Sequence, residues 1–209
     1  MTERPGGATA GTLLWLAVFT AVLIWSVIAP YDYFTWLLEV LPALLGAAVL
    51  GATRRHFPLT PLAYVLILGF SIILMVGGHY TYARVPLFDV LGRVLGWQRN
   101  NYDKLGHFAQ GFVPAIVARE VLLRLGVVNG RAWLNFFILS VCLAISALYE
   151  LVEWGVAMVS GQAAQNFLGT QGYVWDTQSD MAMALAGAAA ALLLLPRLHD
   201  RQLRRVKHP

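Results

Sequence analysis

Six long, mostly apolar runs follow one another along this chain, and they restrict its fold more than any other feature. A helix needs about 20 predominantly apolar residues to cross the hydrocarbon core of a bilayer. Within that core every backbone amide and carbonyl group must be hydrogen-bonded inside the protein, so runs of this length form helices. The sequence therefore predicts an all-α fold, a polytopic transmembrane helix bundle of about six spans.

The expected spans cover residues 13–29, 37–52, 59–78, 103–125, 133–158 and 179–195, within a single membrane domain of residues 1–209. The first run has no convincing small-residue cleavage site, so we expect it to remain in the protein as a span. The second run is short and contains Pro42, which makes its ends the hardest to place.

A short amphipathic helix is expected near residues 86–97, between the third and fourth spans. Its apolar residues recur at helical spacing, and Trp97 is a residue type found at membrane interfaces. They are Leu87, Leu91, Val94 and Leu95. We interpret this helix as an interfacial element that covers the outer mouth of the bundle.

Composition supports lipid as the main solvent of this chain. Hydrophobic residues make up 58% of it and charged residues only 12%, whereas soluble domains contain about 25% charged residues. Cys142, the one cysteine, stands in an apolar run, which excludes an intramolecular disulfide and Cys-x-x-Cys metal sites. We interpret Cys142 as a small core residue.

Lysine and arginine positions predict the orientation, because cytoplasmic segments of membrane proteins are enriched in both. With a cytoplasmic N-terminus, eleven of them fall in inner segments: Arg4, Arg54, Arg55, Arg119, Arg124, Arg131, Arg197, Arg201, Arg204, Arg205 and Lys207. Four fall in outer segments: Arg84, Arg93, Arg99 and Lys104. Both termini are therefore expected in the cytoplasm. The basic tail, residues 197–209, is interpreted as a topology determinant near anionic lipid, with no nucleic-acid partner.

Three pairs of ionisable residues stand three or four positions apart at the outer ends of the last three spans. They are Asp103 with His107, Glu150 with Glu153, and Asp176 with Asp180. These spacings place each pair on one helix face, and the predicted topology brings all three pairs to the same membrane level. His79, at the outer end of the third span, is expected to be close enough to join them.

Five carboxylates at this level require compensation, because like charges in a partly desolvated volume do not all stay ionised. The nearby cations, Lys104 and Arg99, are too few. Either several carboxyl groups are protonated or a cation is bound. An oxygen-rich site with one or two imidazoles suits a divalent metal ion such as Zn²⁺, Mn²⁺ or Mg²⁺. The candidate metal ligands are Asp103, His107, Glu150, Asp176, Asp180 and His79, with Glu153 as the candidate catalytic general base.

A purely structural interpretation of these residues competes with the metal site. In it, Asp103 and Asp176 cap the helices that they begin, and Glu150 and Glu153 are hydrated at the interface. On the inner side, Glu120 is interpreted as a solvated partner of the arginines that flank it. His56, His199 and His208 are interpreted as surface histidines.

Several catalytic motifs are absent from the sequence: His-Glu-x-x-His, Gly-x-Ser-x-Gly, the phosphate-binding P-loop, the dinucleotide Gly-x-Gly-x-x-Gly, and the Glu-x-x-His of di-iron bundles. A serine hydrolase, an ATP-driven pump and a nicotinamide enzyme are therefore poorly supported.

Four stretches resemble the YjdF-like family of bacterial inner-membrane proteins. They are GGHYTY (77–82), YDKLGHFAQGF (102–112), YELVEW (149–154) and LGTQGYVWDTQSDM (168–181). The resemblance covers most of the chain and implies a multi-pass protein of the bacterial cytoplasmic membrane, but no reaction. Weaker similarity, through Asp103, His107, Glu150 and the Asp176–Asp180 pair, links the chain with VanZ-like membrane proteins, which are associated with glycopeptide resistance.

Three functional hypotheses follow. The first is a metal-dependent membrane enzyme that acts on a lipid-linked or amphiphilic substrate at the outer face. The second is a proton- or cation-coupled transporter or channel, with the carboxylates as relay or ion site. The third is a non-enzymatic lipid-binding or assembly protein. Membrane lipids are expected partners in all three, and the oligomeric state stays open.

Overall fold

The computed structural model of the protein describes residues 10–161 and 165–206, which form helices joined by short connections and contain no strand. The long helices are α1 (Ala10–Val27), α2 (Tyr33–Thr53), α3 (Pro61–Tyr80), α5 (Tyr102–Arg124), α6 (Arg131–Ser160) and α8 (Asp176–Leu194). The short ones are the 3-10 helix Tyr82–Arg84, α4 (Pro86–Leu95), α7 (Gln165–Leu168) and α9 (Pro196–Leu203). The predicted all-α bundle is thus confirmed. Arg4, Lys207 and His208 lie outside the described residues.

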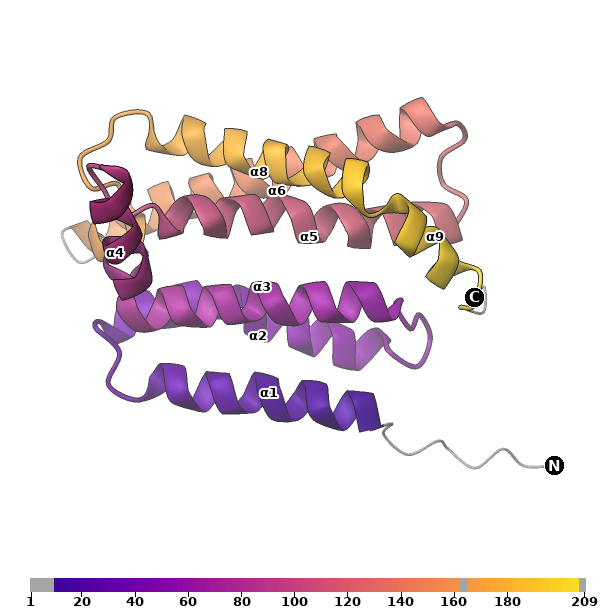
Figure 1. The fold of residues 1–209 in the computed structure, drawn as a ribbon, viewed down its shortest axis with the longest axis horizontal. Helices are drawn as coiled ribbons and strands as arrows, with labels where there is room; N and C mark the ends of the chain where they lie inside the picture. The colour runs from indigo at the N-terminus through magenta and orange to yellow at the C-terminus, as the bar shows by residue number, and fades with distance from the viewer. Residues whose placement is uncertain (1–9, 162–164, 207–209) are drawn as a thin grey trace.

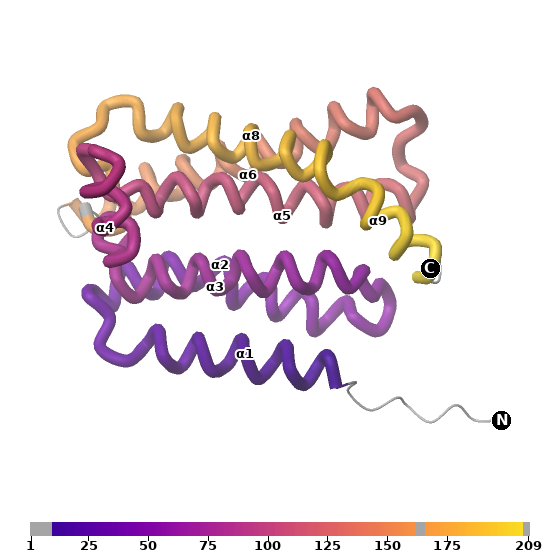
Figure 2. Tube along the Cα trace, viewed as in Figure 1, coloured from indigo at the N-terminus to yellow at the C-terminus, as the bar shows by residue number. Residues whose placement is uncertain are grey.

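The long helices form two layers, one of α1, α2 and α3 and the other of α5, α6 and α8 (Figure 1). Helices α3 and α5 pack against each other and join the layers. Successive long helices run in opposite directions, so α4 lies at one end of the bundle and α9 at the other (Figure 2). We call these the α4 end and the α9 end.

Five helices, α1, α2, α3, α6 and α8, are long and apolar enough to cross a membrane. Helix α5, with 23 residues, matches them in length but is more polar. It packs against α3, α6 and α8, and these neighbours shield its polar side chains from lipid. We therefore treat α5 as the sixth span, one that a hydropathy criterion alone does not identify.

Helix boundaries lie close to those predicted, with the largest difference at the start of α2. This helix begins at Tyr33 instead of residue 37 because Asp32 caps it. The Asp32 Oδ2 atom accepts hydrogen bonds from the Thr35 hydroxyl at 2.6 Å and from its backbone amide at 3.0 Å. These bonds hold the pKa of the Asp32 carboxyl below its usual value. Tyr33, Phe34 and Trp36, which follow the first span, are thus part of the second.

The amphipathic helix expected near residues 86–97 is present as α4 and lies across one end of the bundle (Figure 1). It ends at Gly96, whose φ of +70° is readily adopted by glycine. Leu87, Val94 and Leu95 are exposed on its surface, as an interfacial helix requires.

Helices α5 and α8 touch backbone to backbone at two glycines. A Cβ atom on Gly111 would overlap the carbonyl oxygen of Ala184, and one on Gly187 would overlap the carbonyl oxygen of Phe108. Small residues allow such close approach, which favours helix association in lipid through van der Waals contact. Cys142 is fully buried beside this contact, with its Sγ atom 3.5 Å from the Gly111 carbonyl oxygen, so its interpretation as a core residue is confirmed.

A second polar cluster lies at the α9 end and joins α9 to α5. The fully buried Glu120 carboxylate accepts hydrogen bonds from the Thr60 hydroxyl at 2.8 Å and from Arg124 Nη1 at 3.0 Å. Its Oε2 atom lies 3.2 Å from His199 Nε2, and Arg119 Nη1 lies 3.0 Å from His199 Nδ1. We call these five residues the α9-end cluster.

The interpretations of Glu120 as solvated and of His199 as a surface residue were wrong. Both side chains are fully buried, because α9 turns at Pro196 and packs back against the bundle. Sequence position alone suggested a solvated tail. His56, in contrast, is exposed as expected.

We predict that Gly111→Ala destabilises the bundle by roughly 1–3 kcal/mol or more, since the added methyl group forces the two backbones apart. Gly69→Ala is the matched control, because a Cβ atom there meets nothing within 4 Å. The reaction of the single buried thiol, Cys142, with a thiol-reactive fluorophore on heating measures the unfolding temperature in detergent. An unchanged midpoint for Gly111→Ala would contradict the close helix contact.

Glu120→Ala is predicted to release α9, because removal of one partner from a buried charged network costs about 3–5 kcal/mol. Limited trypsin digestion in detergent should then cut at Arg201 faster than in the unmodified protein. Asp200→Asn serves as the control: its carboxylate pairs with Arg119 at 2.7 Å but is 45% exposed, so its loss should cost less than about 1 kcal/mol. Equal cleavage of both variants would refute the role of Glu120.

Candidate metal centre and adjoining cavity

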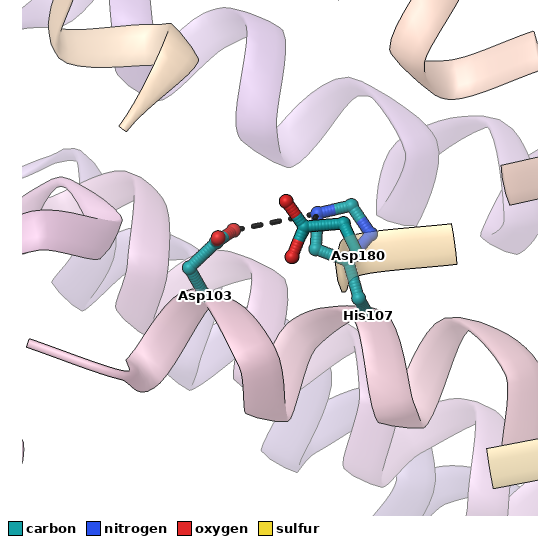
Figure 3. Close-up of side chains that lie close together, drawn as sticks. All are labelled: Asp103, His107 and Asp180. Carbon is teal, nitrogen blue, oxygen red and sulfur yellow. Dashed lines mark ion pairs between the residues drawn. The ribbon is translucent and has the colours of Figure 1, made fainter. Parts of the chain in front are cut away.

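The first two turns of α5 place Asp103 and His107 on one face of the helix, one turn apart (Figure 3). Close α5–α8 packing brings Asp180 opposite them. Neither Asp103 nor Asp176 caps its helix through its side chain, since both lie inside the first turn. The capping interpretation of these two residues is therefore wrong.

Asp103, His107 and Asp180 each offer a ligand atom, and these atoms lie within 4.8 Å of one another. The His107 Nε2 atom is 3.4 Å from Asp103 Oδ1, 3.9 Å from Asp180 Oδ1 and 3.9 Å from Glu150 Oε1. In a tetrahedral site with metal–ligand distances near 2.0 Å, ligand atoms are about 3.3 Å apart. A modest contraction would thus bring the ligand atoms of Asp103, His107 and Asp180 around one cation, with Glu150 Oε1, 3.9 Å from His107 Nε2, as a further donor.

Gln110 sets the orientation of the His107 ring. The Nδ1 atom of His107 lies 3.0 Å from Gln110 Oε1, and a carbonyl oxygen only accepts hydrogen bonds, so Nδ1 carries the proton. The Nε2 atom is then directed towards the carboxylates. Metal-binding histidines in general donate their second N–H to a carbonyl or carboxylate oxygen in this way.

Glu150 supplies an oxygen atom without a hydrogen-bond partner. The residue is 8% exposed, and its Oε1 atom is buried and accepts no hydrogen bond from the residues that the structure describes. Buried polar atoms are nearly always satisfied, so an isolated one calls for a ligand. A cation beside His107 Nε2 would satisfy it.

Arg99 and Lys104 neutralise part of the acidic cluster. Asp176 Oδ1 lies 2.6 Å from Arg99 Nη1 and 3.0 Å from Lys104 Nζ, and Lys104 Nζ also lies 2.5 Å from Asp180 Oδ1. Asp176 is thus held by two cations instead of facing His107. The two cations Arg99 and Lys104 are fewer than the carboxyl groups of Asp103, Glu150, Asp176 and Asp180, so they compensate the acidic cluster only in part.

His79 lies apart from the other predicted ligands. Its Nδ1 atom is 3.1 Å from the Ser26 carbonyl oxygen, and its ring packs 4.4 Å from the Trp25 ring. The structure therefore brings together Asp103, His107, Glu150 and Asp180 and leaves His79 against α1.

Glu39 joins the site, although the sequence argument passed over it. It is buried in α2, and its Oε2 atom accepts a hydrogen bond from Tyr149 Oη at 3.2 Å. The sequence does contain one sign of this role, a carboxyl group inside a predicted apolar span. Burying an ionisable group in a membrane costs free energy, so such groups usually have a function. No other ionisable residue stands three or four positions from Glu39, so the spacing of ionisable pairs does not reveal it.

A cavity of about 140 Å³ adjoins the cluster. Its polar wall comprises Glu39, Tyr82, Asp103, His107, Gln110, Tyr149 and Glu153. Its apolar wall comprises Pro42, Phe70, Leu74, Gly106, Pro114 and Ile145. Glu153, the candidate general base, thus faces the same space as two of the candidate metal ligands.

Comparison with known proteins confirms the resemblance inferred from the sequence. The family model described as "Predicted membrane protein (DUF2238)" matches residues 11–201. The chain is 55% identical over 186 residues to the inner membrane protein YjdF of Escherichia coli (strain K12), with 89% of each chain covered. No solved structure matches the chain. A match over this length, together with a helical bundle of apolar spans, shows that the chain belongs to the DUF2238 family of membrane proteins.

Proposed function

We propose that this protein is a divalent-metal-dependent enzyme of the bacterial cytoplasmic membrane that acts on a lipid-linked or amphiphilic substrate. The observation that carries the proposal is the arrangement of three buried carboxylates around His107 Nε2, one of them with the unpartnered Oε1 atom of Glu150. The membrane assignment follows the name of the YjdF relative. The excess of basic residues at the α9 end supports a cytoplasmic location of both termini.

The ligand set favours particular ions. One imidazole with three carboxylates suits Zn²⁺ or Mn²⁺, whereas Mg²⁺ prefers oxygen ligands and retains several waters. Asp103, His107, Glu150 and Asp180 would hold the ion. A bound divalent cation supplies Lewis acidity to a carbonyl or phosphoryl oxygen and acidifies bound water.

Glu153 is assigned the role of general base, because it lines the cavity that His107 and Asp103 also line. A carboxylate there can accept a proton from a water or hydroxyl group in the cavity. Gln110 fixes the ring of His107 through Nδ1, and Asp176 holds Arg99 and Lys104 beside the site.

Coupled transport of protons or cations is the second hypothesis, and the packing between the two polar clusters weakens it. Gln110 and Arg119 are separated by nine residues of α5, about 13 Å along the helix. Fully buried Ile116, Ile138 and Ala188 fill this layer. A transported ion would need a polar route through it. The third hypothesis, non-enzymatic lipid binding, requires the cavity but no metal.

We predict that protein purified in detergent without any chelator contains about one Zn²⁺ or Mn²⁺ per chain, measured by mass spectrometry of the dissolved metal. His107→Ala and Asp180→Asn should remove it. His79→Ala is the matched histidine control and should retain the metal, because His79 contacts Ser26 and Trp25 instead. Metal-free unmodified protein would overturn the proposed function and leave lipid binding as the better hypothesis.

Gln110→Ala is predicted to weaken metal binding about 10–100-fold without abolishing it, since a partner that orients a metal-binding histidine has effects of this size. Competition with a fluorescent chelator measures the change in Kd. Gln178→Ala is the control, because this glutamine is exposed on α8. If both variants bind metal equally well, Gln110 has no orienting role.

A further inference from the structure

The cavity beside the candidate metal centre changes from polar to apolar along the helix axes. On α5 its wall runs from Asp103 and His107 to Gln110 and then Pro114, a distance of about 16 Å at 1.5 Å per residue. Polar groups therefore line its portion near the α4 end, and apolar groups line the deeper portion.

The walls from α6 and α2 follow the same order. On α6 the lining residues proceed from Glu153 through Tyr149 to Ile145, and on α2 from Glu39 to Pro42. Each of these series moves away from the α4 end (Figure 1). An amphiphilic molecule with its polar group towards His107 matches this gradient.

Partly exposed residues of both α2 and α6 line the cavity, and we call the line between these two helices the α2–α6 seam. Ile145 is 38% exposed, and Pro42 and Glu153 are half-buried, although all three line the cavity. The hydrogen bond from Tyr149 to Glu39 crosses the seam. At this depth of a membrane-spanning bundle, the exposed side of the seam faces hydrocarbon.

The volume of the cavity limits the size of the molecule that can enter it. About 140 Å³ is close to the roughly 150 Å³ of an engineered apolar cavity that accepts benzene in another protein. The cavity therefore takes a head group or a few carbon atoms, and the rest of a lipid chain has to remain outside, in the bilayer.

We propose that an amphiphile with a polar, oxygen-bearing head group enters the cavity sideways from the bilayer through the α2–α6 seam. Its head group lies towards His107, the adjoining carbons lie against Pro114 and Phe70, and the rest of its chain passes out between α2 and α6. The Tyr149–Glu39 hydrogen bond closes the seam and opens on entry. The orientation of the head group rests on the proposed metal site, whereas the lateral route does not.

The test uses the full chain in lipid nanodiscs with a fatty acid that carries a photoreactive diazirine near its carboxyl group. Cross-linked peptides are identified by mass spectrometry, and the metal content is measured in the same samples. We expect labelling of the α5 stretch from Gln110 to Pro114 and of α6 around Ile145. Ile145→Trp should fill the seam and reduce this labelling roughly tenfold. A tenfold reduction corresponds to about 1.4 kcal/mol in the free energy of binding.

Leu148→Trp is the matched control, because Leu148 is 62% exposed on the same helix and does not line the cavity. It should retain both the labelling and the metal. Labelling confined to the outer faces of the bundle, or labelling that Ile145→Trp leaves unchanged, would overturn the lateral route. Cavity labelling in protein without metal would support the route and overturn only the enzyme proposal.

Tyr149→Phe gives an independent measurement, because it removes only the hydroxyl group that reaches Glu39. If this hydrogen bond closes the seam, the variant should be labelled several-fold faster than the unmodified protein. The reason is that opening the seam no longer requires breaking a hydrogen bond, which contributes about 1 kcal/mol to the closed state. An unchanged or slower rate would contradict the gating role of Tyr149.

Discussion

The close contact between α5 and α8 is the constraint on which the rest of the structure depends. Gly111 and Gly187 allow the two backbones to touch, and the same contact holds Asp180 against Asp103 and His107. A wider helix pair would separate the Asp180 carboxyl group from Asp103 and His107. The packing thus concentrates negative charge, and Arg99 and Lys104 offset only part of it. The candidate metal centre is a consequence of how tightly two helices pack.

The polar helix α5 can stand inside a membrane protein because its neighbours cover it. Its charged groups are sorted to its two ends, Asp103 and Lys104 at one and Arg119, Glu120 and Arg124 at the other. At the α9 end each principal charge has a counterpart in Thr60, His199 or Asp200. At the α4 end the Glu150 Oε1 atom has none. The unpartnered Glu150 oxygen is the observation that favours a ligand at the α4 end.

The cavity adjoins the acidic cluster at Asp103 and His107. Its wall combines carboxyl groups with apolar side chains from α2, α3, α5 and α6, so a molecule bound there meets both a polar end and a hydrocarbon-like end. Pro42 and Pro114 stand in the middle of their helices and line it. Proline lacks a backbone donor and disturbs regular helix geometry, and both of these prolines stand in the apolar part of the cavity wall.

The sequence by itself determined the helical fold, the approximate limits of the six long helices and the grouping of the acidic residues at one end, because apolar length and a spacing of three or four residues are local properties of a helix. Only the tertiary structure decided which helix faces meet. It added Glu39 to the site, left His79 against α1 and buried His199 beneath the returning α9. These outcomes depend on the packing of helices distant in sequence, and no periodicity within one helix encodes it.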